Sequence, residues 1–190
     1  PSEAWALIKK QSTPSGTSLL TAYTYATVAA QSGHNDQVIE LLEQRTKHPN
    51  WNTFPFLDFV LGNAKLRKLD TDAVYHFERF LKNHQGQNDL KAAHLRLAWC
   101  ALLKKDKNKY LFHITAVQNI GNKTNGRDKD AFHLANLDLV PNLQLIKARL
   151  LFDGGYYEEA NSNLLQLSPK AINNIYEALE FAYRKARIAQ

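Results

Sequence analysis

One stretch, residues 145–167, limits most strongly what this chain can fold into. It reads LIKARLLFDGGYYEEANSNLLQL, with apolar residues at helical spacing on both sides of Gly154-Gly155. Because two adjacent glycines break a helix, the stretch predicts two helices joined by a tight turn. Ala148 and Ala160, twelve positions apart across that turn, are small enough to let antiparallel helices approach closely. We therefore expect a helical hairpin here.

The same skeleton recurs along the chain. The small residues at corresponding positions are Ala26, Gly62, Ala98 and Ala148, and they are separated by 36, 36 and 50 residues. The first two intervals match the period of a two-helix solenoid repeat. The third interval is longer because a polar, turn-rich stretch, residues 121–130, interrupts the period. We expect a short helix to follow it at residues 131–137.

These spacings predict one domain over residues 1–190, built from helical hairpins. The four hairpins are expected at about residues 17–47, 54–85, 88–119 and 142–167, with an extra segment at 120–141 and a terminal helix at 170–189. A further short helix is expected at residues 3–11. The terminal helix has no partner and the chain contains no methionine, so we expect a fragment of a longer protein.

The composition is that of a soluble globular protein, with 44% hydrophobic and 22% charged residues. No apolar run reaches the roughly 18 residues that a membrane-spanning helix needs. Cys100 is the single cysteine, which excludes an internal disulfide and a cysteine-based zinc site. Cytoplasm and bacterial periplasm both fit, and any signal peptide would lie outside this sequence.

The hairpins resemble tetratricopeptide repeats. That family prefers a small residue in the first helix, a turn seven positions later, alanine beyond the turn and an apolar residue four positions further on. The matching residues are Ala148, Gly155, Ala160 and Leu164 in the fourth hairpin, Ala26, Gly33, Val38 and Leu42 in the first, and Ala98, Lys105, Tyr110 and Ile114 in the third. The segments FPFLDFVLGNAKLRKLD and ARLLFDGGYYEEA also look like those of uncharacterised bacterial proteins built from such repeats.

Over residues 17–189 the resemblance implies an all-α fold, a right-handed α-solenoid of antiparallel helix hairpins. The chain departs from the family in three respects. The usual tryptophan and proline are absent or displaced, the second turn is one residue shorter, and the insertion after Ile120 breaks the period.

The resemblance also implies a binding groove, because the first helix of each hairpin lines the concave side in this family. The residues carried over to the groove are Tyr23, Asn63, Arg67, Trp99, Arg149, Tyr183 and Arg187. Arginines beside aromatic residues suit a peptide, since guanidinium groups bind carboxylates and rigid rings anchor apolar side chains. The alternative is that Trp99 is simply core and that the arginines pair with local acids, such as Arg149 with Asp153.

No catalytic or metal-binding constellation is evident. Residues 121–126 have the spacing of a phosphate loop, but no Lys-Ser or Lys-Thr follows and no strand precedes them. His76 and His84 are eight positions apart, too far for one metal ion on one helix. We therefore expect no enzymatic activity, no cofactor, no metal and no small-molecule substrate.

The sequence favours a non-catalytic protein–protein interaction scaffold that binds a peptide or protein segment in the concave groove. The net charge of +6, from 24 Lys and Arg against 18 Asp and Glu, favours an acidic partner. One alternative is an RNA-binding helical repeat, although the basic residues do not recur at one repeat position. Another is a structural or regulatory arm of a larger envelope assembly or enzyme.

Overall fold

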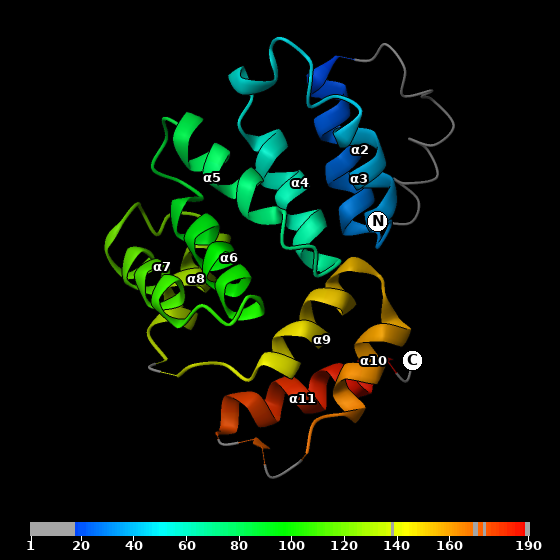
Figure 1. The fold of residues 1–190 in the computed structure, drawn as a ribbon, viewed down its shortest axis with the longest axis vertical. Coiled ribbons are helices and arrows are strands. Elements are labelled where there is room, and N and C mark those ends of the chain that lie inside the picture. Colours follow the sequence, from blue (N-terminus) through cyan, green and yellow to red (C-terminus); the bar gives the residue numbers. More distant parts are fainter. Residues whose placement is uncertain (1–17, 138, 169–170, 173, 189–190) are drawn as a thin grey trace.

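The computed structural model describes residues 18–137, 139–168, 171–172 and 174–188, and these residues contain helices and no strand (Figure 1). The all-α prediction is therefore confirmed. The elements are α2 (Leu19–Gln31), α3 (Asn35–Glu43), the 3-10 turn η1 (Trp51–Thr53), α4 (Phe56–Arg67), α5 (Ala73–Asn83), α6 (Leu90–Leu103), α7 (Lys107–Asn119), α8 (Gly126–Ala135), α9 (Leu143–Gly154), α10 (Tyr157–Leu165) and α11 (Ile175–Ile188). The short helix expected at residues 3–11 lies outside the described residues.

Four pairs of consecutive helices pack against each other, α2 on α3, α4 on α5, α6 on α7 and α9 on α10. They coincide with the four expected hairpins. Each turn contains one residue with a positive φ, seven positions after the small residue that marks the repeat; these residues are Gly33, Leu69, Lys105 and Gly155. Glycine adopts this conformation without strain, whereas Leu69 and Lys105 adopt it because the surrounding helices require the turn.

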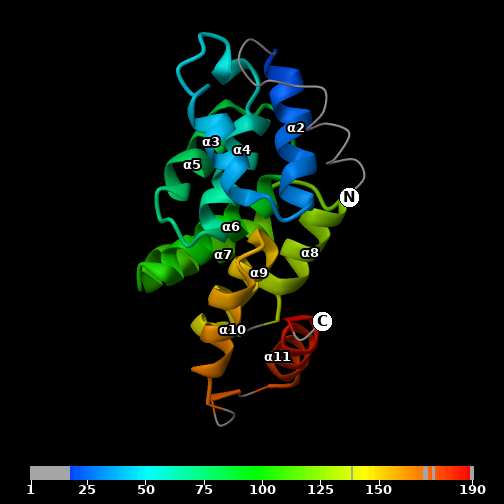
Figure 2. The same cartoon turned by 90° about the vertical axis from the view of Figure 1, so that its right-hand side faces the viewer.

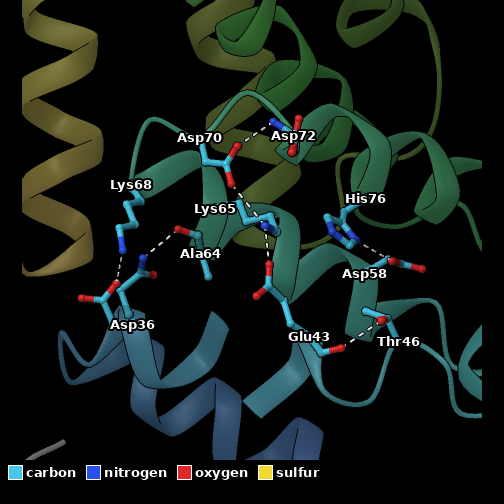
Figure 3. Close-up of polar contacts among 11 residues, drawn as sticks. Asp36, Glu43, Thr46, Asp58, Ala64, Lys65, Lys68, Asp70, Asp72 and His76 are labelled. Carbon is cyan, nitrogen blue, oxygen red and sulfur yellow. Dashed lines mark hydrogen bonds and ion pairs between the residues drawn. The ribbon is translucent and has the colours of Figure 1, made fainter. Parts of the chain in front are cut away.

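Successive hairpins stack in the first part of the chain, where α3 packs on α4 and α5 packs on α6. Polar contacts reinforce the first of these junctions (Figure 3). Lys65 Nζ lies 2.5 Å from a Glu43 carboxylate oxygen and 3.1 Å from one of Asp70. Asn35 donates a hydrogen bond to the carbonyl oxygen of Ala64 at 2.7 Å. These contacts fix how the first hairpin sits on α4.

The extra segment between the third and fourth hairpins belongs to the core. It forms α8, which packs on α6 and α7. Helix α8 begins at Gly126, five residues before the expected start, because the side chain of Asn125 caps it by accepting from the Asp128 N–H. The buried Asp128 carboxylate in turn accepts from the backbone N–H groups of Asp89 and Ala92, at 2.6 and 3.0 Å. The insertion therefore supplies the acid that caps the start of α6.

The fourth hairpin, α9 and α10, does not simply stack on the hairpin that precedes it. Helix α9 packs on α4, α11 and, less extensively, α6. Its turn rests on the turn of the first hairpin, where the Tyr156 hydroxyl donates to Asp36 at 2.8 Å. At the same place a Cβ added to Gly155 would overlap the carbonyl oxygen of Gly33. The structure thus departs from a regular solenoid after α8.

The result is an arrangement in three layers, visible in Figure 2. Helices α3, α5, α7 and α10 lie on one side, α4, α6 and α9 lie in the middle, and α2, α8 and α11 lie on the other side. The middle helices are therefore covered by both outer layers. None of the helices described in this structure is long and apolar enough to cross a membrane.

Candidate functional site

Three arginines converge at the centre of the middle layer, one from each of its helices. Arg67 comes from the end of α4, Arg96 from α6 and Arg149 from α9. Burial, together with the positive charges of Arg149 and Arg67, lowers the pKa of Arg96 to about 9. Burial also lowers the pKa of Arg67. At neutral pH all three side chains are charged, so the fold holds like charges close together.

Trp99 and Asn63 hold this group in place. The guanidinium carbons of Arg96 and Arg149 lie 4.5 and 5.3 Å from the centre of the Trp99 ring, within the range of cation–π attraction. Arg96 Nε donates to the Asn63 side-chain oxygen at 3.0 Å. We call Asn63, Arg67, Arg96, Trp99 and Arg149 the arginine cluster. The guanidinium groups are positioned by a ring and an amide rather than by acids.

Among the described residues, no guanidinium of the arginine cluster donates a hydrogen bond to a carboxylate. Arg67 Nη1 donates to the carbonyl oxygen of Ala30 at 3.2 Å. Arg149 Nε is buried without a hydrogen-bond partner, and the nearest carboxylate oxygen, on Glu180, is 4.0 Å away. The guanidinium groups of the cluster therefore lack a hydrogen-bonded carboxylate, and their charge is only partly balanced, by Glu180 beside Arg149 and by Asp153 near Arg67 and Arg96.

The two acids near the cluster, Asp153 and Glu180, accept hydrogen bonds from a different arginine. Arg184 of α11 donates to Asp153 at 2.7 Å and to Glu180 at 2.9 Å. Arg149 and Asp153, which the sequence suggests as a local pair, do not form an ion pair within 4.0 Å in the described part of the chain. Arg149 thus keeps only the longer contact with Glu180, and its Nε has no hydrogen-bond acceptor.

A cavity of about 200 Å³ adjoins the cluster, enclosed by α6, α7, α8, α9 and α11. Trp99 and Arg149 line it together with mainly apolar side chains. Glu177 and Glu180 lie on its α11 side, where Glu177 already accepts from the Asn142 backbone N–H at 2.7 Å. The cavity and the arginine cluster thus share two residues.

The structure brings together four of the seven residues expected in the groove, namely Asn63, Arg67, Trp99 and Arg149. Tyr23 packs instead against the ring of Phe54, 4.9 Å between ring centres, in the core of the first hairpin. Tyr183 and Arg187 are exposed on α11, outside the cluster.

Arg96 was not among the expected groove residues. The repeat register places its neighbour Leu95 in the groove, but Leu95 is buried and lines the cavity. Trp99, one turn after Arg96 on α6, is in the cluster as expected, so Arg96 extends the expected set on the same side of the helix. No feature of the sequence alone marks Arg96 as a member.

The remaining candidate groups, a histidine pair and the single cysteine, offer neither a reactive side chain nor a metal site. The Nδ1 atoms of His94 and His113 lie 3.1 Å apart, and burial, with the nearby His113 and Lys91, lowers the pKa of His94 to about 4. Burial raises the pKa of the Cys100 thiol to about 12, so it stays protonated and is a poor nucleophile. In the described ranges no group of three or more His, Cys, Asp or Glu could hold a metal ion.

Comparisons with known proteins give no match: no family model, no curated protein and no solved structure is similar to this chain. The resemblance to tetratricopeptide repeats therefore stays a prediction. The functional argument depends on the geometry of the arginine cluster.

Proposed function

We propose that this protein is a non-catalytic binding module of the tetratricopeptide-like class, which holds an acidic segment of a partner protein at the arginine cluster. The observation that carries the proposal is the meeting of Arg67, Arg96 and Arg149 from three separate helices with no hydrogen-bonded carboxylate among the described residues. Buried charges are otherwise paired in folded proteins. A group of arginines that is only partly balanced by its own acids suits an anion from outside the chain.

The energetics favour a carboxylate. Each guanidinium is planar and can donate two parallel hydrogen bonds to a carboxylate, at distances of roughly 2.7–2.9 Å. Burial is the main cause of the lowered pKa of Arg96, and the charges of Arg149 and Arg67 add to it, so an anion placed between the arginines would offset both the burial and the repulsion. Trp99 is itself part of the hydrophobic core, as the sequence alternative had it, and supports the proposal only by holding the guanidinium groups of Arg96 and Arg149.

The proposal can be tested with synthetic peptides. A phage-displayed random peptide library is first selected on the immobilised protein, and the enriched peptides are then measured by fluorescence anisotropy. We expect enrichment of Asp and Glu, and at least about tenfold weaker binding when those residues are changed to Asn and Gln, because each hydrogen bond to a charged group contributes roughly 1.5–3 kcal/mol.

The matched variants have equal net charge. In one, Arg96→Gln and Arg149→Gln remove two charges from the cluster; in the other, Lys104→Gln and Lys107→Gln remove two exposed charges from the turn between α6 and α7. We expect the arginine variant to lose binding and the lysine variant to keep it. Equal loss in both would mean that only the net charge attracts the peptides. Tighter binding of a single-stranded RNA than of any peptide, at physiological salt, would replace the proposal with the RNA-binding alternative.

A further inference from the structure

We infer that the cavity beside the arginine cluster receives one large apolar side chain of the bound segment, flanked in that segment by an acidic residue. This inference rests on the proposed function and specifies its ligand. It predicts that the partner is recognised by an aromatic or large aliphatic residue next to Asp or Glu, rather than by negative charge alone.

The walls of the cavity suit an apolar group. Four of its five helices and the segment after α8 contribute apolar side chains, chiefly Leu95, Ile114, Leu134, Leu137, Leu145 and Ile146, while α11 contributes Glu177 and Glu180. Burying an apolar side chain against such walls is favourable by about 25 cal/mol per Å² removed from water. Large aromatic side chains offer the most area for this purpose.

The size of the cavity suits a side chain rather than a whole small molecule. Pockets for drug-sized ligands usually measure roughly 300–1,000 Å³, whereas an apolar cavity of roughly 150 Å³ is enough for benzene. At about 200 Å³ the present cavity has room for one ring or one branched aliphatic group. The rest of the ligand must lie outside it.

The shared residues place an acid beside that side chain. Trp99 and Arg149 belong both to the cavity wall and to the arginine cluster, so a group in the cavity lies within one residue's reach of the guanidinium groups. Arg149 Nε is buried and lacks an acceptor, with Glu180 4.0 Å away. A carboxylate next to the inserted side chain would supply the acceptor.

The test compares two acidic peptides that differ at one central residue, phenylalanine or alanine. Both are acetylated at the N-terminus and amidated at the C-terminus, so that only side chains carry charge. We expect the phenylalanine peptide to bind about 30-fold more tightly in fluorescence anisotropy, the loss typical of truncating a buried anchor.

The matching change in the protein is Ile114→Phe, which fills the cavity from α7. It should abolish the preference for phenylalanine, leaving both peptides with the affinity of the alanine peptide. Leu111→Phe, which adds the same type of ring at an exposed position of α7, should leave the preference unchanged. If Ile114→Phe fails to fold by circular dichroism, Leu137→Phe fills the cavity from the opposite side.

A second measurement locates the bound ring. The chain has three tryptophans, and with fluorinated tryptophan the resonance of Trp99, assigned from its absence in Trp99→Phe, should shift with the phenylalanine peptide and much less with the alanine peptide. Equal affinity for both peptides, or a preference that survives in the filled variants, would overturn the inference and leave the proposed function standing. Failure of both peptides to bind would overturn the proposed function itself. Binding of decanoate as tight as that of the phenylalanine peptide would assign the cavity to small amphipathic acids instead.

Discussion

Helix α4 carries two charged sites that differ in how their charge is balanced. Near its start, the fully buried carboxylate of Asp58 accepts a hydrogen bond from Trp51 Nε1 at 3.0 Å and contacts His76 Nδ1 at 2.9 Å. Arg79 Nε lies 3.4 Å from the same carboxylate. At the other end of α4, Arg67 belongs to a cluster that has no hydrogen-bonded carboxylate among the described residues and is only partly balanced, by Asp153 and Glu180. A charge whose partners the chain supplies serves the fold, whereas one that the chain balances only in part can take a partner from a ligand.

The largest effect should come from the balanced site. Asp58→Ala removes the shared acceptor of Trp51, His76 and Arg79, and we expect it to lower the free energy of unfolding by about 3–5 kcal/mol, because the partners stay buried. Urea unfolding followed by circular dichroism measures this. Asp130→Ala, at an exposed position of α8, is the matched control and should change stability by less than about 0.5 kcal/mol. If Asp58→Ala lowers the free energy of unfolding by less than about 1 kcal/mol, the Asp58 site does not stabilise the fold more than the arginine cluster does, and the comparison fails.

The pair of His94 and His113 is a third kind of polar site. His94 avoids a buried charge by losing its proton, which an arginine cannot do at neutral pH. His94 has a folded-state pKa of about 4, below the usual 6.5, so the unfolded chain binds more protons between these values. Stability is therefore complete above pH 6.5 and falls as the pH drops toward 4. We expect His94 to account for about 2–3 kcal/mol of that loss.

The measurement is urea unfolding of wild type and His94→Gln across this pH range. The variant should lack the His94 contribution and unfold with a weaker pH dependence, while His113, whose pKa is also lowered by burial, remains. Asp36 and Asp70 also have lowered pKa values, so they titrate below their usual 3.8 in both proteins and cancel in the comparison. Parallel pH profiles would show that the histidine pair is not kept neutral by the fold.

The smallest effect on stability should come from the arginine cluster. Arg96→Met removes one of three mutually repelling charges and keeps an apolar stem beside Trp99. Replacing a buried charge with an apolar residue is often neutral or stabilising, so we expect a change within about 1 kcal/mol, in contrast to Asp58→Ala. The same urea experiment measures it. A loss above about 2 kcal/mol would assign Arg96 to the fold and contradict its role in binding.

Much of the fold could be predicted from the sequence because the repeat is local. A small residue followed seven positions later by a residue with positive φ occurs in all four hairpins, with Leu69 and Lys105 in place of glycine in the second and third. The prediction of a shorter second turn was wrong, since residues 68–72 separate α4 from α5 and only residues 32–34 separate α2 from α3. The start of α8 was missed because Asn125 caps it from within a stretch that reads as a loop. The return of α9 to α4 could not be predicted, since it depends on contacts between turns far apart in the sequence.

In the candidate site, too, some residues could be predicted from local spacing and others depend on long-range packing. Asn63 and Arg67 lie one helical turn apart on α4, so their common location could be predicted from the repeat pattern. Arg96 could not, because the repeat pattern selects Trp99 on α6 and gives no reason to add Arg96, three positions earlier. Tyr183 and Arg187 were carried over from a regular stack, and the fourth hairpin, on which their helix α11 packs, leaves that stack. Local spacing predicted the helices, and long-range packing decided which side chains meet.

The contact between the first and fourth turns also sets an order of folding. The hydrogen bond between Tyr156 and Asp36 spans 120 positions, and closing so long a loop has a large entropic cost, so the contact should form late. The first three hairpins can bury their cores through near neighbours before then. Arg149 reaches Trp99 only once α9 has docked on α4. A nascent chain would thus display Arg67 and Arg96 without their third partner, and partner capture would report that folding is complete.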